Sequence, residues 1–198
     1  MGRSHTVNVA AAIAGGGRAD AARSERYSRP AVILHWLMAV LLIGQIGMGL
    51  YMVELPKRTP EVAYYYNLHK SLGLVALMLI AVRLAWRWRR PPPASPELHR
   101  SALLEKLAQA SHRLLYACML LIPLFGLAGS SFGKYPVKFF GYALPQFGWE
   151  SPLLQGLFRQ VHAAVAWLLC ALIVLHLLAV VYHLVTSGGD VLRRMSVR

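Results

Sequence analysis

Acidic residues and cysteines are scarce in this sequence. Its 198 residues hold eight Asp and Glu against 21 Lys and Arg, a formal net charge of +13. The two cysteines, Cys118 and Cys170, both lie inside long apolar runs, so a structural disulfide is not expected and metal-ligand spacing is absent. The sequence contains no Cys-x-x-Cys-His, which excludes ordinary covalent attachment of a c-type haem.

Long apolar runs without a polar face dominate the rest of the chain, which is 57% hydrophobic. A bilayer is crossed by about 20 apolar residues, whereas a helix of a soluble protein keeps one polar side. Four stretches reach that length, and they run approximately over residues 31–53, 68–86, 112–132 and 161–185. We therefore predict an all-α membrane protein, a single four-transmembrane-helix bundle surrounded by lipid.

The basic residues predict the orientation of this bundle. The N-terminal tail, the second loop with its flanks and the C-terminal tail hold 15 of the 21 Lys and Arg. The positive-inside rule then places both termini in the cytoplasm. The positive charge is explained by topology, so no nucleic-acid site is expected. Only six cations fall on the outer side: Lys57, Arg58, Lys70, Lys134, Lys138 and Arg159.

Three segments outside the predicted spans have their own expectations. Residues 1–26 are interpreted as a disordered cytoplasmic extension, because their weak apolar run makes a poor signal peptide. Residues 96–111 carry a modest amphipathic pattern, which predicts a segment on the membrane surface before the third span. The third loop, residues 133–160, is rich in aromatic residues and is expected to form an interfacial lid on the outer side.

Two histidines on the fourth apolar segment are the most informative residues. His162 and His176 are fourteen residues apart, which is almost four full turns of helix, so both imidazoles emerge on one face. At ~1.5 Å per residue they are separated by about 21 Å along the axis. Polar side chains in hydrocarbon are costly and usually functional. The pair therefore predicts two stacked cofactors.

The predicted topology gives each of these histidines a partner at the same depth. His35 lies near the inner end of the first span and matches His176, whereas His69 lies near the outer end of the second span and matches His162. An imidazole on each side of a planar macrocycle is the ligation of a bis-histidine haem b, which leaves no open position for oxygen. The alternative is a set of interhelical hydrogen bonds, and zinc is disfavoured because no carboxylate or cysteine lies at a matching depth. His112 and His183 are interpreted as interfacial residues.

Several neighbours of these histidines are candidates for contacts with a haem. Arg83 lies fourteen residues after His69, at the depth of the inner pair, and is a candidate partner for a propionate or a snorkelling arginine. Lys70 and Ser71 are candidates for contacts with the outer haem or with an anion that arrives from outside. Gly73 and Ala166, each one turn after a histidine, are expected to leave room for a flat ring.

Four segments together resemble the bacterial cytochrome b561 family. They are RYSRPAVILHWLMAV, NLHKSLGLVALMLIAVRLAWR, SHRLLYACMLLIPLFGLAGSSFGK and HLLAVVYHLVTSGGDVLRRM, so the resemblance covers residues 27–198. It implies a four-helix inner-membrane protein that holds two haem b groups on His35, His69, His162 and His176. It also implies electron exchange with ubiquinone and, for one member of the family, oxidation of superoxide at the periplasmic face. The sequence departs from relatives at two places. His162 is followed by alanine, where relatives often have an acidic or aromatic residue, and Tyr182-His183 stands where two adjacent histidines are common.

Three functions are weighed from these observations. The first is a di-haem electron-transfer protein that connects an outer donor, such as superoxide, with ubiquinone. The second is the cytochrome b membrane anchor of a larger dehydrogenase, hydrogenase or reductase, and the third is a haem-free helical scaffold. A quinone site is expected near a membrane interface, among aromatic and polar groups. The candidates are the aromatic outer loop or, on the inner side, Trp36, Trp86, Trp88 and Tyr116.

Overall fold

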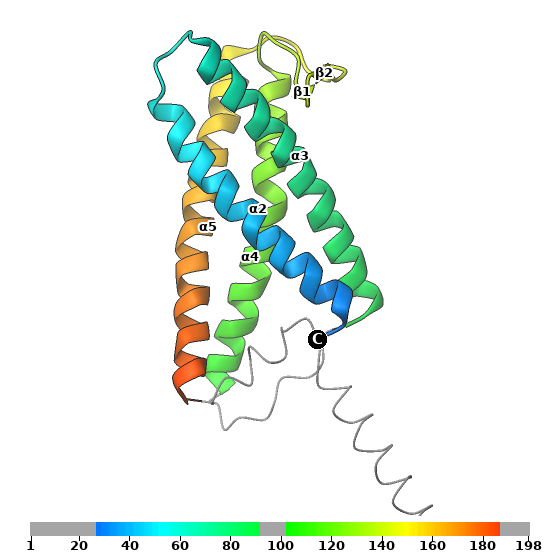
Figure 1. The fold of residues 1–198 in the computed structure, drawn as a ribbon, viewed down its shortest axis with the longest axis vertical. Coiled ribbons are helices and arrows are strands. Elements are labelled where there is room, and N and C mark those ends of the chain that lie inside the picture. Colours follow the sequence, from blue (N-terminus) through cyan, green and yellow to red (C-terminus); the bar gives the residue numbers. More distant parts are fainter. Residues whose placement is uncertain (1–26, 92–101, 187–198) are drawn as a thin grey trace, which may run out of the picture.

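Four long helices form the molecule in the computed structural model, which describes residues 27–91 and 102–186 (Figure 1). They are α2 (Arg29–Glu54), α3 (Pro60–Arg89), α4 (Ala102–Ser131) and α5 (Pro152–Thr186). All four are long and apolar enough to cross a membrane, which confirms the predicted all-α membrane bundle. We call the end that carries the α2–α3 connection and the α4–α5 connection the outer end; it lies at the top of Figure 1.

Two helices begin about two turns before the predicted spans, and their caps explain why. At the start of α3 the Thr59 hydroxyl accepts a hydrogen bond from the Val62 amide, Pro60 occupies the first turn and Glu61 follows. All three features favour the first turn of a helix. The start of α5 has the same kind of cap, because the Ser151 hydroxyl accepts a hydrogen bond from the Leu154 amide. Hydropathy locates the bilayer, whereas the caps locate the helix ends.

The first turns of α4 correct the predicted surface segment. Residues 102–111 continue without a break into the apolar part of the 30-residue helix. The amphipathic pattern over these residues therefore belongs to the end of a long helix, and not to a separate element. Residues 96–101, like the extension over residues 1–26, lie outside the described part of the chain.

The helices pack in chain order, α2 on α3, α3 on α4 and α4 on α5. The buried core lies between α4 and α5, where Cys118 meets Leu169 and Leu172. Many large apolar side chains remain exposed along all four helices, and Val40 and Leu178 are examples at 70% and 62% exposure. A soluble protein rarely shows so much apolar surface. Lipid is the solvent that suits it.

A small hairpin closes the outer end beside α3. Its strands β1 (Lys138–Phe139) and β2 (Tyr142–Ala143) pair antiparallel through a two-residue turn, Phe140 and Gly141, both with positive φ. β1 packs against α3. The buried Ser71 hydroxyl accepts the Phe140 amide at 2.9 Å, and its Oγ, as donor, lies 2.8 Å from the Asn67 carbonyl oxygen and 3.2 Å from the Lys138 carbonyl oxygen. One hydroxyl in α3 thus fastens the outer loop.

Candidate functional site

The structure brings both depth-matched histidine pairs together. The ring centres of His35 and His176 are 6.5 Å apart, and those of His69 and His162 are 6.2 Å apart. One metal ion about 2 Å from an imidazole nitrogen on each side would place the two ring centres about 6 Å apart. Each pair therefore has a spacing that would suit one metal ion held between two imidazoles. The rings belong to α2 and α5 in the inner pair and to α3 and α5 in the outer pair.

His162 is held by the main chain of α4. Its Nδ1 donates to the Ile122 carbonyl at 2.9 Å, because Ile122 is a main-chain acceptor that has no proton to give. This hydrogen bond leaves Nε2 with a free lone pair, which is how metal-ligating histidines are oriented by the atoms behind them. Gly126 makes the approach feasible, since a Cβ there would lie 3.2 Å from Nδ1 and 3.3 Å from Cε1.

His69 has a different surrounding. A Cβ on Gly49 of α2 would lie 3.6 Å from its Cε1, so the ring packs directly over helix backbone. Its Nδ1 is buried and has no hydrogen-bond partner among the described residues. The nearest polar side chain that contacts this residue is Gln45, whose amide Nε2 donates to the His69 carbonyl at 2.9 Å.

The inner pair is surrounded by polar and charged side chains. Arg83 Nη2 lies 3.3 Å from His35 Nδ1, while Nη1 donates to the Ala31 carbonyl and Nε to the Tyr116 hydroxyl. The guanidinium thus joins α2, α3 and α4 at the depth that the sequence predicted for it. Because an arginine only donates, the contact uses the Nδ1 lone pair of His35.

His112 is a neighbour of the inner pair. Its ring centre lies 5.6 Å from that of His176 at an angle of 86°, and its Nδ1 donates to the Ala108 carbonyl of its own helix. The side chain is exposed, in keeping with an interfacial residue. Its contact with His176 is nevertheless a feature that span depth alone did not predict, since it depends on how α4 is turned toward α5.

The remaining predicted site residues have mixed outcomes. Lys70 is half-buried next to His69 on α3, whereas the Ser71 hydroxyl is engaged by the outer loop. A Cβ on Gly73 would meet the Gln45 amide at 3.5 Å, so this glycine makes room for a side chain of α2. The glycines beside the imidazoles are Gly49 and Gly126, which come from neighbouring helices and which sequence spacing did not indicate.

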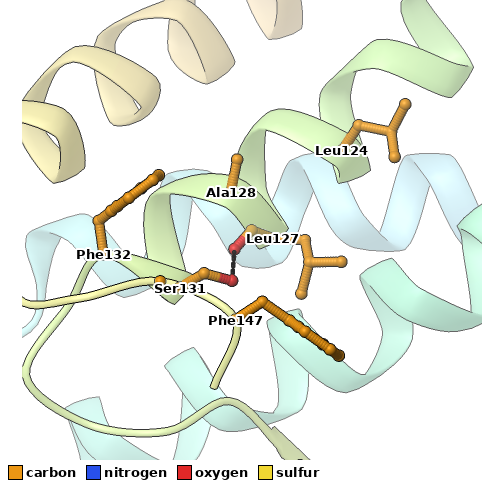
Figure 2. A pocket seen from close by; sticks show the side chains of 7 residues that line it. Leu124, Leu127, Ala128, Ser131, Phe132 and Phe147 are labelled. Atoms are coloured by element: carbon orange, nitrogen blue, oxygen red, sulfur yellow. Dashed lines mark hydrogen bonds between the residues drawn. The ribbon is translucent and has the colours of Figure 1, made fainter. Parts of the chain in front are cut away.

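An apolar cavity lies beside α4 near the outer loop (Figure 2). It has a volume of about 300 Å³, and its apolar lining includes Leu124, Leu127 and Phe147. The only hydroxyl drawn in its wall, on Ser131, donates to the Leu127 carbonyl within the helix. The cavity is therefore suited to an apolar ligand.

Five of the six outer cations are exposed at this end, and Lys70 is the half-buried sixth.

Comparison with known proteins identifies the family. Residues 26–196 match the family of prokaryotic cytochrome b561. The chain is 29% identical to cytochrome b561 homolog 2 of Escherichia coli K12 over 172 residues, which are 86% of this chain and 91% of that protein. It is 27% identical to the probable superoxide oxidase CybB of Yersinia pestis over 180 residues, 86% of this chain and 96% of that protein. Four membrane helices and a family match that spans nearly the whole chain lead to one conclusion: this chain belongs to the prokaryotic cytochrome b561 family, multi-pass proteins of the bacterial inner membrane that bind haem b and transfer electrons across the membrane.

Proposed function

We propose that this chain binds two haem b groups and carries single electrons between a donor at the outer face and ubiquinone. The observation that supports the proposal is the presence of two imidazole pairs, each with ring centres 6.2–6.5 Å apart, at two depths of one helix. His162 and His176 lie about 21 Å apart along α5 at ~1.5 Å per residue. The two sites therefore lie near opposite edges of the membrane.

The protein's part is to hold the ligands and set their surroundings. A haem b bound between the imidazoles of a pair supplies a centre that accepts and gives one electron. His162 is already oriented for ligation, because its Nδ1–H donates to the Ile122 carbonyl, which leaves the Nε2 lone pair free. His69 completes the outer pair. His35 and His176 form the inner pair.

Arg83 has a further role in this proposal. When His35 ligates through Nε2, its ring proton resides on Nδ1, and Arg83 can no longer donate to that atom. Its Nη2 would then be available to pair with a haem propionate, for which the planar set of guanidinium donors is well suited. The Ala31 carbonyl and the Tyr116 hydroxyl continue to hold it at this depth.

Superoxide is the donor that we propose for the outer face. One relative carries the name probable superoxide oxidase, and the outer segments of this chain hold six cations against three carboxylates, Glu54, Glu61 and Glu150. A net positive surface raises the local concentration of an anion and speeds its encounter. Both termini lie in the cytoplasm in this orientation, as the distribution of Lys and Arg indicates.

The quinone site has two candidate locations. The outer cavity has the apolar lining that ubiquinone prefers, whereas the inner group of Trp36, Trp86, Trp88 and Tyr116 offers aromatic and polar contacts near His35. A photoreactive ubiquinone analogue separates them. Labelled peptides from α4 and the outer loop would assign the cavity, and labelled peptides from the inner ends of α2 and α3 would assign the other site.

The decisive experiment combines a spectrum with a turnover assay. The purified protein is expected to show the Soret and α-bands of b haem and a haem-to-protein ratio of two. Superoxide added to the ubiquinone-loaded protein should yield quinol. Absence of haem bands would favour the helical scaffold, and haem without quinol formation would remove superoxide as the donor. Co-purification of a soluble redox subunit would favour the membrane-anchor alternative.

A further inference from the structure

Two buried polar atoms without partners lie on two residues that contact each other across the α2–α3 interface. They are Oε1 of Gln45 and Nδ1 of His69, and within the described residues no other buried side-chain nitrogen or oxygen lacks a hydrogen bond. The two residues touch, since Gln45 Nε2 donates to the His69 carbonyl at 2.9 Å. An unsatisfied polar atom is costly in the hydrocarbon region, so each of these two atoms calls for a partner.

The orientation of the Gln45 amide is determined by its contact. The opposite orientation would bring the amide oxygen against the carbonyl oxygen of His69, where both atoms are acceptors. Oε1 is therefore the free end of the amide and needs a donor. Gly73 leaves the space that the amide occupies, because a Cβ there would lie 3.5 Å from Nε2.

The other atom of the pair needs the opposite partner. A histidine that binds iron through Nε2 carries its ring proton on Nδ1, and this N–H is normally given to an oxygen that fixes the ring. His162 has such an oxygen in the Ile122 carbonyl. His69 has none among its own helix or its neighbours. Gln45 thus presents an acceptor next to a histidine that requires one.

We propose that Gln45 is the positioning residue of His69, acting through one water molecule that accepts from His69 Nδ1–H and donates to Gln45 Oε1. The inference rests on the proposed function, because it assumes that His69 is an iron ligand. One water with two polar partners satisfies both atoms, and buried waters occur at polar sites of this kind. Gln45 then contacts His69 at two points: its Nε2 donates to the His69 carbonyl, and its Oε1 is joined through the water to the His69 ring.

The proposal has a consequence for the outer haem alone. An acceptor on the ring N–H makes the imidazole a more basic ligand and favours ferric iron, which lowers the reduction potential. Loss of the Gln45 acceptor should therefore raise the potential of the outer haem. The inner haem, which His35 and His176 would hold about 21 Å further along α5 at ~1.5 Å per residue, should keep its potential.

The test uses isosteric substitutions in the full-length holoprotein. Gln45→Met keeps the shape and removes the acceptor, whereas Gln45→Glu keeps the shape and a side-chain oxygen acceptor. Gln109→Met makes the same chemical change on the exposed side of α4, where the amide donates to Glu105, and serves as the matched control. Redox titration followed by the α-band gives both potentials, and the wave lost in His176→Ala identifies the inner haem.

Expected and contrary results separate clearly. Q45M should raise the outer potential, or lose the outer haem, while Q45E and Q109M retain both haems at wild-type potentials. A redox-difference infrared band of a bound water that shifts in H₂¹⁸O should disappear in Q45M. Unchanged potentials in Q45M, equal changes in Q45M and Q45E, or absence of the water band would overturn the inference. A wild-type protein without two haem waves would instead overturn the proposed function.

Discussion

The outer and inner histidine pairs have similar spacing but different surroundings. The outer pair rests on main chain: the Ile122 carbonyl fixes His162, and Gly49 and Gly126 let the rings lie against helix backbone. The inner pair rests on side chains, with Arg83 on His35 and the His112 ring beside His176. The outer site is therefore shaped by close packing, and the inner site by charge and by long polar side chains.

This difference separates two ways of tuning the same ligands. Close packing sets the position and tautomer of a ring, and it is sensitive to single atoms. Charge near a redox centre sets its potential over a longer distance and tolerates changes of shape. Substitutions at the outer pair should therefore alter haem binding first, whereas substitutions around the inner pair should alter the potential first.

The largest expected effect is the loss of one haem from either pair. His162→Ala removes a proposed outer ligand and His176→Ala a proposed inner one, so on the proposed function each variant should lower the haem-to-protein ratio from about two to about one. A pyridine haemochrome assay measures the ratio. His183→Ala, which changes a histidine of the same helix outside both pairs, should leave it at two. An unchanged ratio in either ligand variant would contradict the pairing.

The second largest effect is expected when one methyl group is added at Gly126. Gly126→Ala places a Cβ 3.2 Å from His162 Nδ1 and should shift the ring by a few tenths of an ångström, which weakens its hydrogen bond to the Ile122 carbonyl. Overpacking of this kind costs about 1–3 kcal/mol, so we expect lower occupancy of the outer haem and a lower unfolding temperature. Gly47→Ala is the matched control, since no atom lies within 4 Å of its Cβ. Equal behaviour of the two variants would contradict the role of close packing.

Removal of charge at the inner pair should have a smaller and different effect. Arg83→Leu removes a cation near His35, and loss of a nearby positive charge favours ferric iron. We expect the inner potential to fall by about 50 mV with both haems retained. Arg87→Leu is the control, because Arg87 lies over the Tyr116 ring one turn further along α3. An outer potential that falls as much as the inner one would show that the charge is not local.

The smallest effect is expected at the outer loop. Ser71→Ala removes the hydroxyl that accepts the Phe140 amide and should leave both potentials unchanged. Loss of one buried hydrogen bond costs about 1–2 kcal/mol, so hydrogen exchange at Phe140 should accelerate about tenfold. Thr186→Ala removes a hydroxyl that, among the described residues, donates to the Tyr182 carbonyl of its own helix, and it should leave the loop protected. A changed outer potential in Ser71→Ala would restore this residue as a contact of the outer haem.

Much of the fold was predictable, because crossing a bilayer leaves a strong signal. Apolar length located all four spans, while helix ends were missed where polar turns such as Glu61–Asn67 continue a helix beyond its apolar part. The correct spans also placed each histidine at a depth, and matching depths brought together His35 with His176 and His69 with His162. Gln45 was not singled out, since one amide in an apolar run gives no indication of its neighbour on another helix.

Depth was determined by the sequence alone, because it follows from the count of residues along a helix at ~1.5 Å each. Lateral contacts were decided only by the tertiary structure. Helices that are apolar on every side carry no stripe to show which face turns inward, so the sequence did not reveal that Gly126 faces His162 or that Arg83 reaches His35. Those contacts depend on how each helix is rotated and packed against its neighbours. That rotation gives the two histidine pairs, alike in spacing, their different surroundings.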